Sequence, residues 1–153
     1  MKRRFSFTGL MLSAALIANT FALPLPAAEG RKLVLVAGGQ SAAAVLSPEE
    51  VRKLYLGVAV TKDGKTFLPL CNHTDMVAYE VFMQKIMYMS GPAYERALIT
   101  RLVRTMSSRP PEYAAERDLL QALAATPSAV TYMWADKAQA AGLKVVAELW
   151  QEK

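Results

Sequence analysis

The first strongly patterned segment of the chain is the aliphatic run KLVLVA over residues 32–37, which ends at Gly38. Apolar side chains occupy consecutive positions in this run instead of alternate ones. Such a pattern predicts a short strand that is buried on both faces. Strands of this kind are most common in parallel sheets whose two faces are covered by helices.

A complete helix start follows this strand. Ser47 is placed to be the N-cap, Pro48 occupies the first helical position, and Glu50 closes a capping box with Ser47. The apolar positions that follow recur at helical spacing, and Gly57 stops the pattern. We therefore expect a helix from Pro48 to the residues just before Gly57.

Further along the chain, patterns of period two alternate with patterns of about 3.6 residues. They predict a turn at Asp63 and Gly64, strands over 66–71, 129–133 and 143–149, helices that start at Thr74 and Pro92, a helix over about 114–125, and a short helix that ends at Ala141. Strands that alternate with helices favour an α/β layered domain, here with a largely parallel sheet flanked by helices. No repeat or linker divides the pattern, so we expect one domain over residues 29–153.

The helix that starts at Pro92 has an apolar side and a basic side by the 3.6-residue period. We expect it to bury Leu98, Leu102 and Met106, with Ile99 and Val103 beside them. The basic side carries Arg96, Arg101 and Arg104. A charged helix side is most often solvated, and we expect the same here.

The first 28 residues have the architecture of a secretory signal peptide. Lys2, Arg3 and Arg4 form a positive start, residues 10–18 form the densest apolar core, and small residues and prolines follow up to Ala28. The apolar core is well short of the roughly 20 residues that span a bilayer, although an uncleaved anchor is the alternative. We expect a periplasmic protein with no membrane span after signal cleavage.

Charge and composition exclude several function classes. Lys and Arg total 18 against 13 Asp and Glu, but three of the cations lie in the leader, so the remainder is only +2. A nucleic-acid-binding domain would carry a clustered basic surface, so we expect no nucleic-acid partner. The chain has one Cys and one His, which leaves little room for a metal site. We expect no metal and no cofactor.

Two places could bind a ligand in the predicted fold. Loops after strands and the first turns of helices are the usual small-ligand sites of open α/β sheets. The candidate residues are Gly39, Gln40 and Ser41 in the turn after the first strand, and Asn72, His73 and Thr74 before the long helix. The alternative is that these residues perform ordinary turn and cap chemistry, with Asp75 as the helix cap.

Two other patterns have a chemical and a structural interpretation. Cys71 and His73 could be a nucleophile and a base, but a residue spacing alone does not supply the third group that such a site needs. Burial as a small apolar residue is the alternative for Cys71. Four methionines, Met76, Met83, Met87 and Met89, could bind copper, but at helical spacing they more often fill a core.

Two separated blocks of the chain resemble a known family. The first block is LSPEEVRKLYLG over residues 46–57, followed by Gly64 and Pro69, and the second is LAATPSAVTY over residues 123–132. The matching positions are Leu46, Ser47, Glu49, Glu50, Leu54, Tyr55, Leu56, Gly57, Gly64, Pro69, Leu123, Thr126, Pro127, Ala129, Val130 and Tyr132. The chain thereby resembles the periplasmic substrate-binding proteins of phosphate ABC transporters, and more closely their short, single-domain relatives.

This resemblance implies a periplasmic-binding-protein-like fold and a non-enzymatic protein that binds a small anion or polar solute. It also implies an ABC permease or an envelope complex as the partner. Phosphate-binding members have an Arg and a Ser-Gly-Thr before the long helix, whereas this chain has CNHTDM over residues 71–76. Asp75 would place a negative charge where an anion should bind. A degenerate relative that acts as an accessory or interaction protein of an envelope complex is therefore the alternative function.

Overall fold

The computed structural model describes residues 30–38, 44–106 and 108–153. Its helices are α1 (Pro48–Tyr55), α2 (Met76–Val81), the π-helix η1 (Phe82–Met87), α3 (Gly91–Thr105), α4 (Glu116–Ala125) and α5 (Ala135–Ala140). Its strands are β1 (Lys32–Ala37), β2 (Thr61–Lys62), β3 (Lys65–Thr66), β4 (Leu68–Pro69), β5 (Cys71–Asn72), β6 (Glu112–Tyr113), β7 (Ala129–Trp134) and β8 (Lys144–Gln151).

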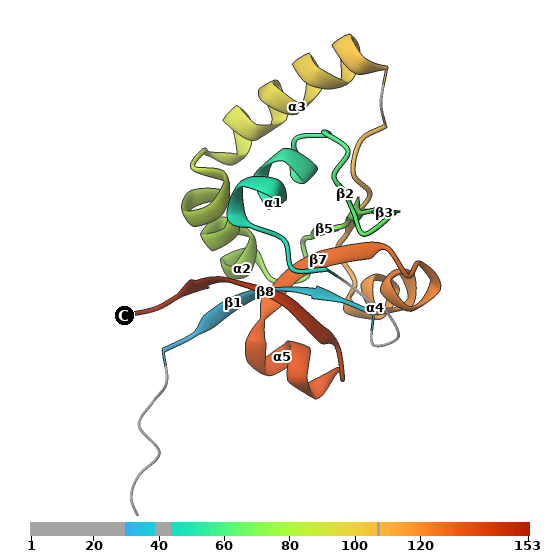
Figure 1. Cartoon of the computed structure of the whole chain (residues 1–153). Helices are drawn as coiled ribbons and strands as arrows, with labels where there is room; N and C mark the ends of the chain where they lie inside the picture. The colour runs from blue at the N-terminus through green and yellow to red at the C-terminus, as the bar shows by residue number, and fades with distance from the viewer. Residues whose placement is uncertain (1–29, 39–43, 107) are drawn as a thin grey trace, which may run out of the picture.

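A mixed sheet with the strand order β4-β7-β1-β8 lies at the centre of the fold (Figure 1). β1 runs antiparallel to both of its neighbours, with Leu35 opposite Tyr132 of β7 and Ala147 of β8. Only the short β4 is parallel to β7 within this sheet. The α/β class is confirmed, but the expectation of a largely parallel sheet is wrong. The aliphatic run of β1 indicates burial on both faces, and burial does not determine the direction of the neighbouring strands.

Both faces of β1 are covered. Because successive side chains of a strand point to opposite faces, Leu33 and Leu35 belong to one apolar cluster and Val34 and Val36 to another. The first cluster includes buried side chains of α1, η1 and α3, and the second includes buried side chains of α4 and α5. The expected arrangement of helices on both faces of the sheet is confirmed.

The start of α1 is as the sequence predicts. The Ser47 hydroxyl accepts a hydrogen bond from the Glu50 N–H (3.2 Å), and a Glu50 carboxylate oxygen accepts one from the Ser47 N–H (2.7 Å). Pro48 is at the first position of the helix. Gly57 follows with a φ of 78°, a left-handed conformation that glycine adopts at little cost. The capping box and the stop of this helix are therefore confirmed.

The expected continuous strand over residues 66–71 is wrong. The turn at Asp63 and Gly64 is confirmed, since both residues have positive φ between the paired strands β2 and β3. Beyond it the chain forms three two-residue strands that pair in turn with β2, β7 and β6. Pro69 lacks an N–H donor and therefore cannot extend a regular ladder.

The helix from Pro92 is observed as α3, but its apolar side is only partly packed. Leu98 is buried as predicted, whereas Met106 is 91% exposed, Val103 72% and Ile99 53%. The expected burial of Met106 is wrong. The buried residues of α3, Tyr94 and Leu98, lie in its first half, and the helix runs along the edge of the molecule away from the sheet (Figure 1).

Candidate functional site

The structure places half of the predicted binding residues. Gly39, Gln40 and Ser41 lie outside the described residues. Asn72, His73 and Thr74 occupy the end of β5 and the turn before α2. Because β5 pairs in parallel with β6, this turn lies beside the segment that leads into α4.

The Asn72 side chain is hydrogen-bonded within the protein through both its nitrogen and its oxygen. Asn72 is buried, and its amide nitrogen donates to the backbone carbonyl of Tyr132 on β7 (2.8 Å). Its Oδ1 accepts from both the Thr74 N–H (2.9 Å) and the Thr74 hydroxyl (2.7 Å). A side-chain oxygen that accepts from the backbone two residues later defines an Asx turn, a common way to fix a tight loop. The two hydrogen bonds from Thr74 therefore hold its backbone and its hydroxyl against the Asn72 side chain.

Asp75 caps α2 and joins it to two other elements. Its Oδ1 accepts from the N–H groups of Val77 (3.0 Å) and Ala78 (3.1 Å), which confirms the predicted cap. Its Oδ2 accepts from the Trp134 indole N–H (3.1 Å) and from the Lys137 ammonium (3.3 Å). Burial alone would raise the pKa of Asp75, but the Ala78 N–H, the Lys137 cation and the Trp134 N–H together hold it below its usual value. Asp75 is therefore an ionised carboxylate with four donors.

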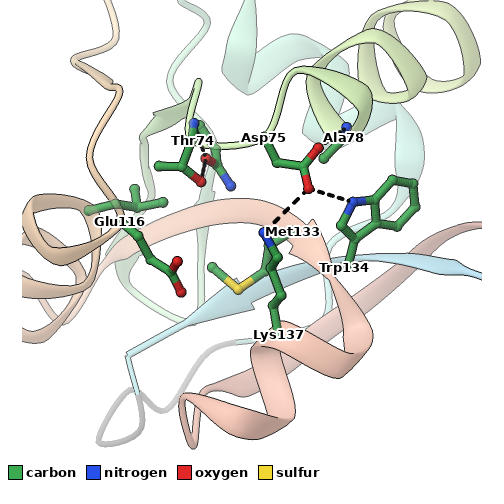
Figure 2. A pocket seen from close by; sticks show the side chains of 9 residues that line it. Thr74, Asp75, Ala78, Glu116, Met133, Trp134 and Lys137 are labelled. Atoms are coloured by element: carbon green, nitrogen blue, oxygen red, sulfur yellow. Dashed lines mark hydrogen bonds and ion pairs between the residues drawn. The ribbon is translucent and has the colours of Figure 1, made fainter.

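A small hollow adjoins this network (Figure 2). Its lining residues are Asn72, Thr74, Asp75, Ala78, Glu116, Leu119, Met133, Trp134 and Lys137. Only about 10 Å³ of the hollow can hold the centre of a water-sized molecule. A single bound water needs roughly 10–15 Å³ measured in this way. The hollow therefore has space for about one water molecule.

The charges around the hollow do not favour an anion. Asp75 and Glu116 contribute two carboxylates, and Lys137 contributes one ammonium group. This ammonium group points toward the Asp75 carboxylate, with which it forms an ion pair (Figure 2). An anion would meet two like charges and one cation that already has a partner.

His73 and Cys71 do not line the hollow, and each contacts a different tyrosine. The His73 ring lies against the Tyr79 ring, with 4.6 Å between the centroids. The Cys71 thiol is free and buried, and its sulfur lies 3.9 Å from the Tyr94 hydroxyl. Burial is the main cause that raises the pKa of Cys71 to about 12, so the thiol stays protonated at neutral pH. The structure therefore favours the structural interpretation of Cys71.

Sequence reasoning missed six of the nine lining residues, and three of the six, Glu116, Trp134 and Lys137, carry polar groups. Trp134 and Lys137 lie 59 and 62 positions after Asp75 and come from the end of β7 and from α5. The sequence around Asp75 contains no signal for these partners, because the packing of β5 and α2 against β7 brings them together. The available sequence feature was a Trp at the end of a buried strand, followed three residues later by a Lys, which places two donors at one end of that strand.

The methionine pattern is confirmed as core packing at two positions. Met83 and Met87 are buried in the same apolar cluster as Leu33 and Tyr55. Within the described part of the chain, no group of three or more His, Cys, Asp and Glu side chains is placed to hold a metal ion. Over the same residues, no helix is both long enough and apolar enough to cross a membrane.

Comparison with known proteins identifies the fold. No protein-family model matches the chain, and no curated protein matches it. Among solved structures, it is similar to "a possible phosphate binding protein" from Planctomyces limnophilus DSM 3776, with a TM-score of 0.52 and 15% identity over 82% of this chain and 46% of that one. It is also similar to PstS from Borrelia burgdorferi, with a TM-score of 0.53 and 11% identity over 78% of this chain and 47% of that one.

These similarities support the fold family that the sequence suggests. At 11% and 15% identity they concern the fold alone. The chain spans about half the length of these two proteins.

Proposed function

We propose that this chain is a non-enzymatic periplasmic protein with the fold of solute-binding proteins that acts as an accessory or interaction protein of an envelope complex. It does not capture free phosphate by itself. An ABC permease or another envelope assembly is the expected partner. The proposal rests on the fold, on the signal-peptide pattern of residues 1–28 and on the state of the hollow beside Asp75.

The single observation that carries the proposal is the use of the binding groups by the protein itself. The Asn72 amide and the Thr74 hydroxyl hydrogen-bond within the protein, and the Asp75 carboxylate holds Lys137. A site for a doubly charged oxyanion needs several free donors and an excess of positive charge. The hollow offers two carboxylates, one paired ammonium group and space for about one water.

The second candidate function is direct binding of a small anion or polar solute. The fold shared with phosphate-binding proteins favours it. Gly39, Gln40, Ser41, Asn72, His73 and Thr74 remain the proposed binding residues for this function. The chain spans about half the length of the two solved neighbours, so their binding of phosphate is only a proposal for this chain.

Native mass spectrometry of the protein purified from its own periplasm separates the two functions. The accessory function predicts a stable complex with another envelope protein and no retained small molecule. The solute-binding function predicts a retained small molecule on the isolated chain. Calorimetry with phosphate, sulfate and small organic anions is the matching solution test. Recovery of a solute-loaded monomer would contradict the first function.

A further inference from the structure

The C-terminal end of α3 carries apolar side chains that are exposed, although Leu102 packs against the core. Ile99, Val103 and Met106 recur at spacings of four and three, which places them on one side of the helix. They are 53%, 72% and 91% exposed. Tyr94 and Leu98 are the buried residues of α3, and the rest of the helix runs along an edge of the molecule (Figure 1).

Beyond Glu95, α3 is strongly basic. Residues 96–106 contain Arg96, Arg101 and Arg104 and no Asp or Glu. Among the described residues, none of these three arginines forms an ion pair. The nearest acidic residue along the helix, Glu95, is already bound to Arg109 at 2.6 Å. The exposed part of α3 therefore combines an apolar stripe with three unpaired cations.

A second copy of the chain is a poor occupant for this surface. Pairing two α3 helices would bring two sets of three arginines together without an acidic partner. Three side chains on one helix also form a small contact compared with the roughly 800 Å² per partner of a stable interface. A groove in another protein would need carboxylates at positions that match arginines on more than one side of the helix.

An anionic lipid surface matches the helix without such fixed positions. Helices that lie in a membrane interface have a basic polar side and an apolar side that enters the region between headgroups and acyl chains. Long arginine side chains reach the lipid phosphates from beside or above such a helix. Neither property depends on a bound solute.

We propose that α3 is an interfacial helix that attaches this protein to the surface of an anionic membrane. Ile99, Val103 and Met106 enter the interface, and Arg96, Arg101 and Arg104 contact lipid phosphates. This inference goes beyond the proposed function and does not depend on the ligand. It also differs from a membrane span, because α3 lies along the surface instead of crossing it.

Vesicle co-sedimentation of the exported protein tests the proposal. We expect binding to vesicles of equimolar phosphatidylglycerol and phosphatidylcholine, and little binding to pure phosphatidylcholine. Added salt should weaken the binding. Replacing one arginine, as in Arg101→Gln, should weaken partitioning about fivefold, the factor that corresponds to ~1 kcal/mol per cation near an anionic surface. Val103→Glu should weaken it about tenfold or more, because it replaces an inserted apolar group with a like charge.

Two matched controls separate the helix from general effects. Val145→Glu makes the same change at a half-exposed valine of β8, and Arg117→Gln removes an exposed arginine of α4. Both controls should bind vesicles as the unmodified protein does. Circular dichroism and thermal melting should show that all variants fold, because the replaced side chains are exposed.

Several results would overturn the proposal. These are absence of binding to the anionic vesicles, equal binding to neutral vesicles, or equal losses in Val103→Glu and Val145→Glu. A dimer in light scattering that Val103→Glu dissociates would assign the stripe to a second copy instead. Each of these results leaves the calorimetry with phosphate unaffected, so the two proposals fail separately.

Discussion

Asp75 joins three elements of the fold, so its removal should have a larger effect than an ordinary surface substitution. Asp75→Asn keeps the shape and the cap of α2, because Asn is as good an N-cap as Asp. It loses the negative charge that faces the Trp134 N–H and the Lys137 ammonium group. Asp75→Ala loses these contacts and the cap as well.

The burial of each partner of Asp75 determines how much stability is lost with that contact. Leaving the largely buried Trp134 N–H without an acceptor costs about 1–3 kcal/mol. The Lys137 side chain is 42% exposed, so its ion pair contributes only about 0–1 kcal/mol. We expect Asp75→Asn to lower the free energy of unfolding by the sum of these losses, about 1–4 kcal/mol. Asp75→Ala should lower it by a further ~1 kcal/mol, the typical value of an N-cap.

Urea unfolding at pH 7 and at acid pH measures both the loss and its cause. The folded pKa of Asp75 is lowered, so its contribution to stability is complete above the unfolded pKa and is lost as the pH falls through the folded pKa. The difference between unmodified protein and Asp75→Asn should therefore shrink in acid. Asp63→Asn is the matched control, because Asp63 lies in an exposed turn where Asn also tolerates positive φ. Equal stability of Asp75→Asn and Asp63→Asn, or a pH-independent difference, would refute this account.

Two further predictions concern export and the buried thiol. N-terminal sequencing of the periplasmic fraction should find a start between Leu23 and Gly30; full-length protein in the membrane pellet would instead indicate an uncleaved anchor. Cys71 should react with thiol reagents only after unfolding, and Cys71→Ser should cost about 1–3 kcal/mol because it buries an additional polar group. Since the folded pKa of Cys71 is raised to about 12, its contribution should be lost as the pH rises from about 9 to about 12. Rapid labelling of the folded protein would contradict this environment.

Local chemistry could be predicted from the sequence where neighbouring residues determine it. The capping box of Ser47 and Glu50, the turn at Asp63 and Gly64 and the cap at Asp75 all involve residues within three positions of one another. These features are confirmed because short-range hydrogen bonds and backbone preferences decide them.

Features that depend on distant partners could not be predicted in the same way. The apolar run of β1 indicated a doubly covered strand, but the antiparallel direction of β7 and β8 depends on how the chain returns. The predicted burial of Met106 is wrong, because helical spacing indicates which side of α3 is apolar but not the point along its length where α3 leaves the core. The contacts of Asp75 with Trp134 and Lys137 likewise arise from the packing of β5 and α2 against β7.

Calorimetric titration of the unmodified protein and of Asp75→Asn with phosphate tests the central claim most directly. A unit charge about 4 Å from the anion costs roughly 4 kcal/mol at an effective dielectric near 20. Charge-assisted hydrogen bonds contribute only about 1.5–3 kcal/mol each. The account predicts no saturable binding to the unmodified protein, because the hollow has space for about one water and Asp75 holds Lys137. Any weak binding that exists should be stronger in Asp75→Asn, because the Lys137 cation and the Trp134 N–H lose their anionic partner. Saturable binding of phosphate by the unmodified chain, unchanged or weakened in Asp75→Asn, would contradict it.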